Sequence, residues 1–172
     1  MKHDTLDQYL ALDTDLPQRA LLTVWDCLAA YREELVLVGG LAIRQLTKPP
    51  SDGGAGPVTL DVDFGIHIAA ESGMYGSIRE TLSGHGFVWK EQRFTRQFSE
   101  IDLHIDLLTD DGQSDGGTTS VDNGLAVSIV PGINRALEKC RLIAVTGKTL
   151  LGVTQTEEVR VADVGPMLVL KL

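Results

Sequence analysis

The sequence predicts an α/β domain in which a sheet is flanked by helices, and three observations support this. A continuous apolar run, Leu35–Val38, stops at two glycines and passes into a helical pattern. Residues 59–68 and 101–108 alternate between apolar and polar side chains, as half-buried strands do. Leu21, Trp25 and Leu28 recur at the spacing of an amphipathic helix.

Composition limits the classes of protein to consider. The 172 residues suit a single domain, 1–172, with a core of its own. The net charge of −9 argues against a broad surface that coats nucleic acid, while leaving room for a small basic track in a cleft. Cys27 and Cys140 each fall in a helical apolar stripe and are predicted to be buried thiols. The chain shows neither a leader-like apolar run at its start nor a segment of transmembrane length, which favours a cytoplasmic protein.

The first half of the chain divides into short elements. Residues 1–15 are polar and acidic, and we expect a loose arm or a short helix there. A helix begins at Pro17 and ends near Tyr31, the strand Leu35–Val38 is buried on both faces, and a short helix runs from Leu41 to about Leu46. The segment 49–57 has the composition of a flexible loop.

The second half is predicted in the same way. A helix over 73–82 stops at Gly84, and short strands follow at 87–90 and 94–98. Residues 109–124 are predicted to form a second flexible loop. The remaining elements are a helix carrying the stripe Ile133, Ala136, Leu137 and Cys140, a strand and turn over 142–153, a short strand at 159–161, and a helix that starts at Pro166.

Gly39 and Gly40 join the apolar strand to its helix. Paired glycines often mark nothing more than a tight strand-to-helix turn. A glycine turn that opens a helix also leaves backbone N–H groups free, with the helix dipole behind them, and this arrangement suits phosphate. Arg44 lies one turn into the helix, where it either faces a triphosphate or is a solvated surface residue.

Asp61 and Asp63 lie two residues apart on the first alternating strand, so their side chains point to the same face. Side by side on a strand the two carboxylates repel each other, unless a cation lies between them. They are either solvated acids on an exposed sheet face or the ligands of a shared divalent cation. The glycine turn upstream favours the second interpretation.

The stretch 101–108 supplies a third acidic side chain. Alternation places Asp102, His104 and Asp106 on one face of the strand. Asp102 and Asp106 are both candidates for a third metal-binding carboxylate, and alternation alone does not choose between them. His104 lies between them and is left out of the site, since a lone histidine on a strand more often orients or packs than reacts.

Lys90, Arg93 and Arg96 form the densest group of positive charges in this acidic chain. A solvated hairpin is the commoner outcome for such a group. Alternatively, the three side chains meet a polynucleotide or a triphosphate tail beside the site.

The order strand, Gly39-Gly40, helix, loop and then Thr59-x-Asp61-x-Asp63 resembles the nucleotidyltransferase superfamily, which has the polymerase-beta-like fold. Within it, residues 38–43 are most similar to AbiEii-type toxin-associated and uncharacterised bacterial members. The resemblance implies a minimal nucleotidyltransferase fold with a mixed, mostly antiparallel sheet flanked by helices. It also implies two Mg²⁺ ions, or Mn²⁺, held by Asp61, Asp63 and a third carboxylate that precedes two apolar residues. Asp106 matches that third position better than Asp102, the second choice. The resemblance further implies an NTP whose phosphates meet Gly39 and Gly40. The acceptor would be a tRNA, a protein or a small molecule, and an antitoxin is a possible partner.

The chain departs from the superfamily pattern at two positions. Pro57 stands where many relatives carry arginine, and Leu41 stands where many carry serine. Lys171 matches a lysine that follows in the resembling families, and we expect the sequence to be the N-terminal part of a longer protein or a shortened member. A non-catalytic nucleotide-binding or interaction domain therefore remains the alternative function, as does a fragment that needs a C-terminal region or a partner chain.

Overall fold

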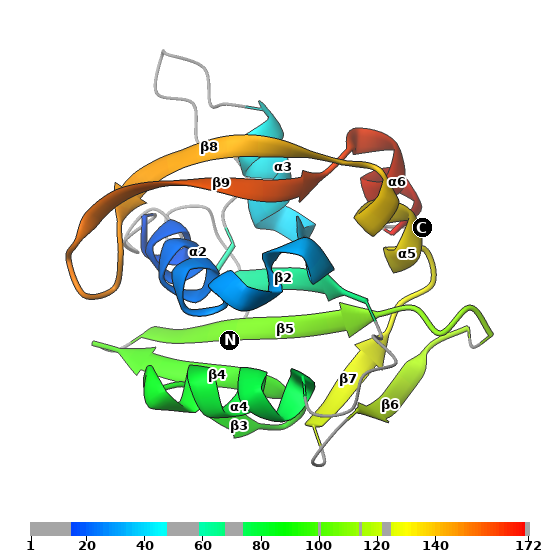
Figure 1. Ribbon diagram of the computed structural model, residues 1–172, viewed down its shortest axis with the longest axis horizontal. Helices are drawn as coiled ribbons and strands as arrows, with labels where there is room; N and C mark the ends of the chain where they lie inside the picture. The colour runs from blue at the N-terminus through cyan, green and yellow to red at the C-terminus, as the bar shows by residue number, and fades with distance from the viewer. Residues whose placement is uncertain are drawn as a thin grey trace.

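A computed structural model describes residues 15–47, 59–67, 74–99, 101–113, 115–121 and 125–170. Within these ranges one nine-stranded sheet runs through the molecule, with helices packed against it (Figure 1). None of the helices in this part of the chain is both long and apolar enough to cross a membrane. The predictions for residues 1–14, for the loop with Pro57, and for Lys171 lie outside the described residues.

Within the described residues, helices separate the early strands, whereas the five strands between Val88 and Ile129 follow one another without a helix between them. The helical elements are α2 (Leu16–Cys27), the 3-10 helix η1 (Ala29–Glu34), α3 (Gly39–Thr47), α4 (Met74–Gly84), α5 (Ile133–Glu138) and α6 (Val164–Val169). The strands are β1 (Leu35–Val38), β2 (Asp61–Ile66), β3 (Val88–Lys90), β4 (Arg93–Phe98), β5 (Ile101–Thr109), β6 (Gly117–Val121), β7 (Leu125–Ile129), β8 (Cys140–Lys148) and β9 (Thr154–Ala162).

The sheet is mixed and mostly antiparallel, which confirms the predicted α/β class. The main strand order is β3-β4-β5-β2-β1-β9-β8, and β7 joins the end of β5 and carries β6. The pairs β1/β9, β2/β5 and β5/β7 are parallel, whereas β1/β2, β3/β4, β4/β5, β6/β7 and β8/β9 are antiparallel. The two strands predicted to carry the acidic residues, β2 and β5, are therefore direct neighbours.

Alternation along β2 separates the two faces of the sheet. Phe64 is fully buried and stacks with Trp25 of α2, with ring centroids 6.1 Å apart, so α2 covers this apolar face. The next residue, Gly65, faces the other side, where a Cβ atom would meet Ile133 of α5 at 3.1 Å. Asp61 and Asp63 share the side of Gly65, so the acidic face of the sheet is the one on which α5 packs.

Two helix boundaries differ from prediction. The first helix ends at Cys27 rather than near Tyr31, because the backbone tightens there: the N–H of Tyr31 bonds to the carbonyl of Leu28, the spacing of a 3-10 helix. The helix after β1 starts at Gly39 rather than Leu41, so the glycine turn is the opening turn of the helix itself.

Cys140 does not belong to a helix, contrary to prediction. Helix α5 stops at Glu138, Lys139 leaves the helical conformation, and Cys140 opens β8. Both cysteines are partly rather than fully buried. Strands β8 and β9 are also longer than predicted, because they pair with each other along their whole length and close with a turn at Thr149–Gly152.

The predicted flexible loop 109–124 contains a strand. Gly117–Val121 forms β6, which pairs antiparallel with β7. Its run of threonine and serine lacks the apolar alternation of a buried strand, because β6 lies beyond the main sheet and pairs with β7 alone. A polar turn remains before it, in which Asp110 accepts a hydrogen bond from the Gly112 N–H at 2.8 Å.

Candidate functional site

The register of three adjacent strands places the predicted acidic residues side by side. In the antiparallel pair β1/β2, Val38 lies opposite Asp63, and in the parallel pair β2/β5, Asp63 lies opposite Asp106. Asp61 lies opposite His104 in the same ladder. Neighbouring strands are about 4.8 Å apart, so the carboxylates of Asp61, Asp63 and Asp106 form one cluster on one face of the sheet.

The glycine turn meets this cluster directly. Gly39 has φ +71°, a left-handed conformation that favours glycine. A Cβ atom at Gly39 would lie 2.0 Å from Oδ2 of Asp63, a separation at which two atoms cannot coexist. The Asp63 carboxylate therefore occupies the space that a side chain at residue 39 would need. The structure thus brings the two halves of the predicted site into contact.

Thr59 connects the start of β2 to the same turn. Its hydroxyl oxygen accepts a hydrogen bond from the Asp61 N–H at 3.2 Å, which fixes the chain just before the strand begins. A Cβ atom at Gly40 would lie 3.2 Å from Cβ of Thr59. A small residue at position 40 and a short branched residue at position 59 therefore allow α3 to begin close to the acidic strand.

Arg93 is the cation that faces the three carboxylates. Its Nε donates to Oδ1 of Asp106 at 2.9 Å, and its Nη2 donates to Oδ2 of the same carboxylate, so the pair is bidentate. Nη2 also lies 3.9 Å from Oδ1 of Asp61. The side chains of Asp106, Arg93 and Asp61 are 19%, 33% and 43% exposed, so the cluster lies at a partly open surface.

The electrostatics of the cluster are concentrated on Asp63. Burial, followed by the nearby charges of Asp106 and Asp61, raises the pKa of the Asp63 carboxyl from an ordinary 3.8 to about 7, and Arg93 offsets part of this effect. The hydrogen bond to Asp106 raises the pKa of the Arg93 guanidinium, which stays charged. One arginine therefore neutralises only part of the charge of three acids.

Three other residues considered for the site lie away from the Gly39–Asp63 contact and from the Arg93–Asp106 pair. Arg44 forms an ion pair with Asp15, with Nη2 3.6 Å from Oδ1, at the start of α2. His104 lies next to Asp61, and its Nδ1 is 3.2 Å from the hydroxyl of Thr95. Asp102 is exposed and lies opposite Gln97, two residue pairs beyond His104 along β5. Asp106 is thus the residue of β5 that stands beside Asp63.

The basic residues of the β3–β4 hairpin do not act as one group. Arg96 lies on the opposite face of β4 from Arg93, where its Nη1 donates to the His85 carbonyl at 2.8 Å and its guanidinium lies 5.8 Å from the centroid of the Phe87 ring. Lys90 is exposed and pairs with Glu91. The sequence groups the three cations by proximity, and strand alternation, applied from the buried Phe94, is the signal that separates Arg93 from Arg96.

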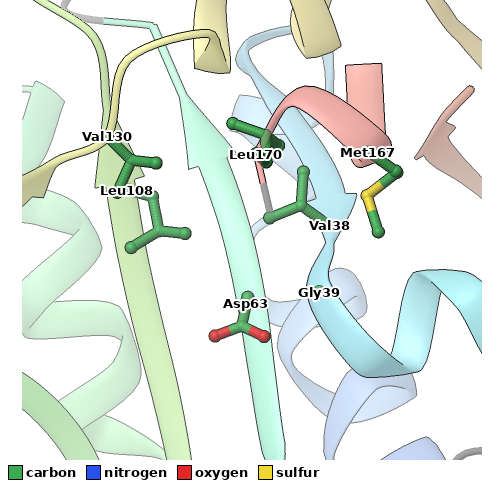
Figure 2. A pocket seen from close by; sticks show the side chains of 7 residues that line it. All are labelled: Val38, Gly39, Asp63, Leu108, Val130, Met167 and Leu170. Carbon is green, nitrogen blue, oxygen red and sulfur yellow. The ribbon is translucent and has the colours of Figure 1, made fainter. Parts of the chain in front are cut away.

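A cavity of about 230 Å³ extends from the Asp63 carboxylate toward α6 (Figure 2). Its walls are apolar apart from Asp63 and the backbone of Gly39, and they come from Val38, Leu108, Val130, Met167 and Leu170. The sequence patterns do not assign these residues to a site. Their role depends on how the ends of β1, β5, β7 and α6 meet, which local patterns do not specify.

The donor set fits a hard divalent cation in its chemistry. Three carboxylates on neighbouring strands supply oxygen ligands, the preferred ligands of Mg²⁺ and Mn²⁺. Burial first, and then the charges of Asp106 and Asp61, raise the pKa of the Asp63 carboxyl, and a bound cation would offset both effects. In the described ranges, however, no three acidic, histidine or cysteine side chains are gathered closely enough to hold an ion as they stand. Binding therefore requires the carboxylates, and with them Arg93, to rearrange.

Comparison with known proteins adds no family to this description: no protein-family model matches the chain, and no curated protein is significantly similar to it in sequence.

Proposed function

We propose that this chain is a metal-dependent nucleotidyltransferase, which moves a nucleoside monophosphate from an NTP to an acceptor hydroxyl and releases pyrophosphate. The observation that carries the proposal is the contact between Gly39 and Asp63, because it joins a helix-opening glycine turn to a cluster of three carboxylates. Phosphate-binding backbone beside oxygen ligands for a divalent cation is the combination that nucleotidyl transfer requires. The resemblance of the motif order to the nucleotidyltransferase superfamily points the same way.

The residues would divide the work as follows. Gly39 and Gly40 would present the N–H groups of the first turn of α3 to the β- and γ-phosphates, with the dipole of this nine-residue helix behind them. Asp61, Asp63 and Asp106 would hold Mg²⁺ or Mn²⁺. Such ions neutralise phosphate charge and lower the pKa of a bound hydroxyl. Asp106 would then orient the acceptor hydroxyl and accept its proton.

The apolar cavity beside Asp63 would receive the flat part of a substrate, and we assign it to the nucleoside of the NTP. Met167→Trp should fill this space, because Met167 lines the cavity. We expect KM for the NTP to rise about tenfold or more, the equivalent of ~1.4 kcal/mol, with Mn²⁺ affinity unchanged. Leu168→Trp is the matched control, since Leu168 is 64% exposed on the same helix. Equal kinetics in the two variants would exclude the cavity from substrate binding.

For the acceptor hydroxyl, we propose a class of molecule rather than a single compound. The net charge of −9 favours a protein or small-molecule hydroxyl over RNA, and the position of Arg96 on the opposite face of β4 shortens any basic track that could follow a tRNA. The resemblance to toxin-associated members extends the proposal to a cytoplasmic protein of bacterial type with an antitoxin as partner.

A second candidate function has a specific observation in its favour. Both oxygens of Asp106 accept hydrogen bonds from Arg93, so this carboxylate is already paired within the protein. Such a pairing would suit a domain that binds a nucleotide or a partner without catalysis. This alternative predicts nucleotide binding without label transfer.

Incubation with each of the four α-labelled NTPs and Mg²⁺ tests the proposal. Total tRNA, the protein itself and small hydroxyl compounds serve as acceptors, and a variant with Asp61→Asn and Asp63→Asn serves as the control. Transfer of label that disappears in the control would support the enzyme and identify the base and the acceptor. Nucleotide binding without transfer by the intact protein would support the non-catalytic alternative.

A further inference from the structure

We propose that Arg93 is a positioning residue that exchanges partners: it holds Asp106 and Asp61 until a divalent cation takes these carboxylates, and it then binds the phosphates of the nucleotide. The inference rests on the proposed function and adds to it an order of events at the site.

The hairpin turn determines where Arg93 stands. Glu91 and Gln92 form the two-residue connection between β3 and β4, with φ +53° and +64°, as in a type I′ turn. Arg93 is therefore the first residue of β4, opposite Lys90. The pairing of Thr95 with His104 continues toward the turn, which places Arg93 beside Asp106 on the acidic face. The guanidinium thus approaches the carboxylates from the end of a strand.

The contact competes with a metal ion for the same oxygen atoms. Both oxygens of Asp106 accept hydrogen bonds from Arg93, and the guanidinium extends to Asp61 as well. A divalent cation bound by these carboxylates would stand within a few ångströms of a positive guanidinium, and like charges at that distance repel strongly. Cation binding and the present Arg93 pairing therefore exclude each other.

Once displaced, Arg93 remains beside the site. Its backbone belongs to a paired strand, while a third of its side chain is exposed, so the guanidinium can turn without any change in the sheet. A triphosphate that lies between the glycine turn and the carboxylates would be the nearest remaining anion. Guanidinium groups bind phosphate through the same two-bond geometry that they use for carboxylate.

Arg96 provides an internal comparison. It lies three residues along the same strand and carries the same charge, but it faces away from the acidic cluster and is held by the His85 carbonyl. Arg93→Ala and Arg96→Ala remove equal charge from the protein. A difference in ligand affinity between the two variants would therefore arise from the position of Arg93 at the site and not from the change in net charge.

The test measures two affinities by calorimetry: that of Mn²⁺ for the protein alone, and that of a non-hydrolysable NTP analogue in the presence of Mn²⁺. In Arg93→Ala and Arg93→Gln, we expect Mn²⁺ to bind about tenfold more tightly and the analogue about tenfold more weakly than in the wild-type protein. Arg96→Ala should change neither affinity. Thermal melting first establishes that each variant is folded. If Arg93→Ala does not fold, Arg93→Gln, which keeps a polar side chain, still allows the measurement.

The other outcomes would overturn the inference. An unchanged or weaker Mn²⁺ affinity in both Arg93 variants would mean that Arg93 is a fixed structural partner of Asp106. Tighter Mn²⁺ binding with unchanged analogue binding would mean that Arg93 excludes the metal without receiving the phosphates. If neither the wild-type protein nor any variant binds Mn²⁺, the proposed function fails, and the inference fails with it.

Discussion

Asp63 is the residue at which the two halves of the site meet, and its environment disfavours the charge that it carries. Burial first, then Asp106 and Asp61, raises its pKa to about 7, so at neutral pH a large share of the molecules carry a proton there. A cation that binds the carboxylates would lower this pKa and release that proton. Because burial and the neighbouring carboxylates disfavour the ionised form of Asp63, the binding of a cation beside it would be favourable.

The raised pKa of Asp63 makes stability depend on pH with a defined sign. The folded protein holds the proton more tightly than the unfolded chain, whose carboxyl has a pKa near 3.8. The stabilising contribution is therefore complete below about pH 4 and is lost as the pH rises through about 7. Between about pH 5 and pH 8, Asp63 should lower the free energy of unfolding of the wild-type protein by on the order of 2 kcal/mol.

Asp63→Asn should remove this part of the pH dependence and raise stability at about pH 8, because the amide carries no charge to desolvate. Urea unfolding at several pH values in a chelating buffer would measure the effect. Asp102→Asn, on the exposed part of the same face, controls for the loss of one acidic charge. An identical pH slope in the wild-type protein and Asp63→Asn would show that the pKa of Asp63 is close to its ordinary value.

Gly39→Ala should be strongly destabilising for two reasons. The left-handed φ of +71° is unfavourable for alanine, and the added Cβ would lie 2.0 Å from the Asp63 carboxylate. We expect a loss of about 2–4 kcal/mol in urea unfolding. Gly84→Ala is the control, because nothing lies within 4 Å of a Cβ there and the residue is helical. Equal stability of the two variants would contradict the close contact between Gly39 and Asp63.

At the scale of elements, helix α2 is tied to the β8–β9 hairpin by polar bonds as well as by packing. The Thr23 hydroxyl is buried, donates to the Arg19 carbonyl and accepts from the Leu150 N–H at 2.8 Å. The indole N–H of Trp25 donates to the Glu158 carbonyl at 3.0 Å. These bonds link α2 to the turn and to the second strand of the β8–β9 hairpin, which lies beyond β1 in the sheet.

Thr23→Val should test this link. Valine has nearly the same shape, but it leaves the buried Leu150 N–H without an acceptor, which costs about 1–3 kcal/mol. Thr47→Val is the matched control, because the Thr47 hydroxyl makes the same type of bond to a helix carbonyl at an exposed position. Chemical unfolding should therefore show a clear loss in Thr23→Val and a change within about 0.5 kcal/mol in Thr47→Val. Similar losses in both variants would contradict a specific role for the Leu150 contact.

The elements that can be predicted from sequence are those with a strong local pattern. The bounds predicted for Leu35–Val38 are those of β1, because a short apolar run that ends at paired glycines is typical of a buried strand. Strand β6 and the full length of β8 and β9 could not be predicted, since their side chains are largely polar or exposed. What defines these strands is pairing, of β6 with β7 and of β8 with β9, rather than a buried face. The end of the first helix differs from prediction because the switch to a 3-10 turn leaves no clear mark in the residues.

In the candidate site too, local patterns predict some features, whereas others depend on how distant segments meet. Alternation suffices to place Asp61 and Asp63 on one face and to group Asp102, His104 and Asp106 on another strand. It cannot choose between Asp102 and Asp106 by itself, because that choice depends on the register between β2 and β5. The contact of Arg93 with Asp106 and the cavity beside Asp63 depend in turn on how strands and helices far apart in sequence meet.

At the scale of the whole molecule, the strand order explains why one site can form from distant segments. Strands β1, β2 and β5 are adjacent in the sheet, and β4 adds Arg93 from the far side of β5. Helix α3 starts at the end of β1, and α6 packs near the same end and closes the apolar cavity. The segments that supply the paired glycines, the three carboxylates and the guanidinium thus converge on one region of the sheet.

A titration of the protein with Mn²⁺ at about pH 8, where Asp63 is mostly ionised, would show whether the three carboxylates bind a cation. The wild-type protein and the Asp102→Asn control should bind Mn²⁺ saturably with similar affinity, and Asp63→Asn should bind at least tenfold more weakly. Equal binding by the wild-type protein and Asp63→Asn, or no saturable binding by the wild-type protein, would contradict the claim that Asp61, Asp63 and Asp106 form a cation site beside the glycine turn.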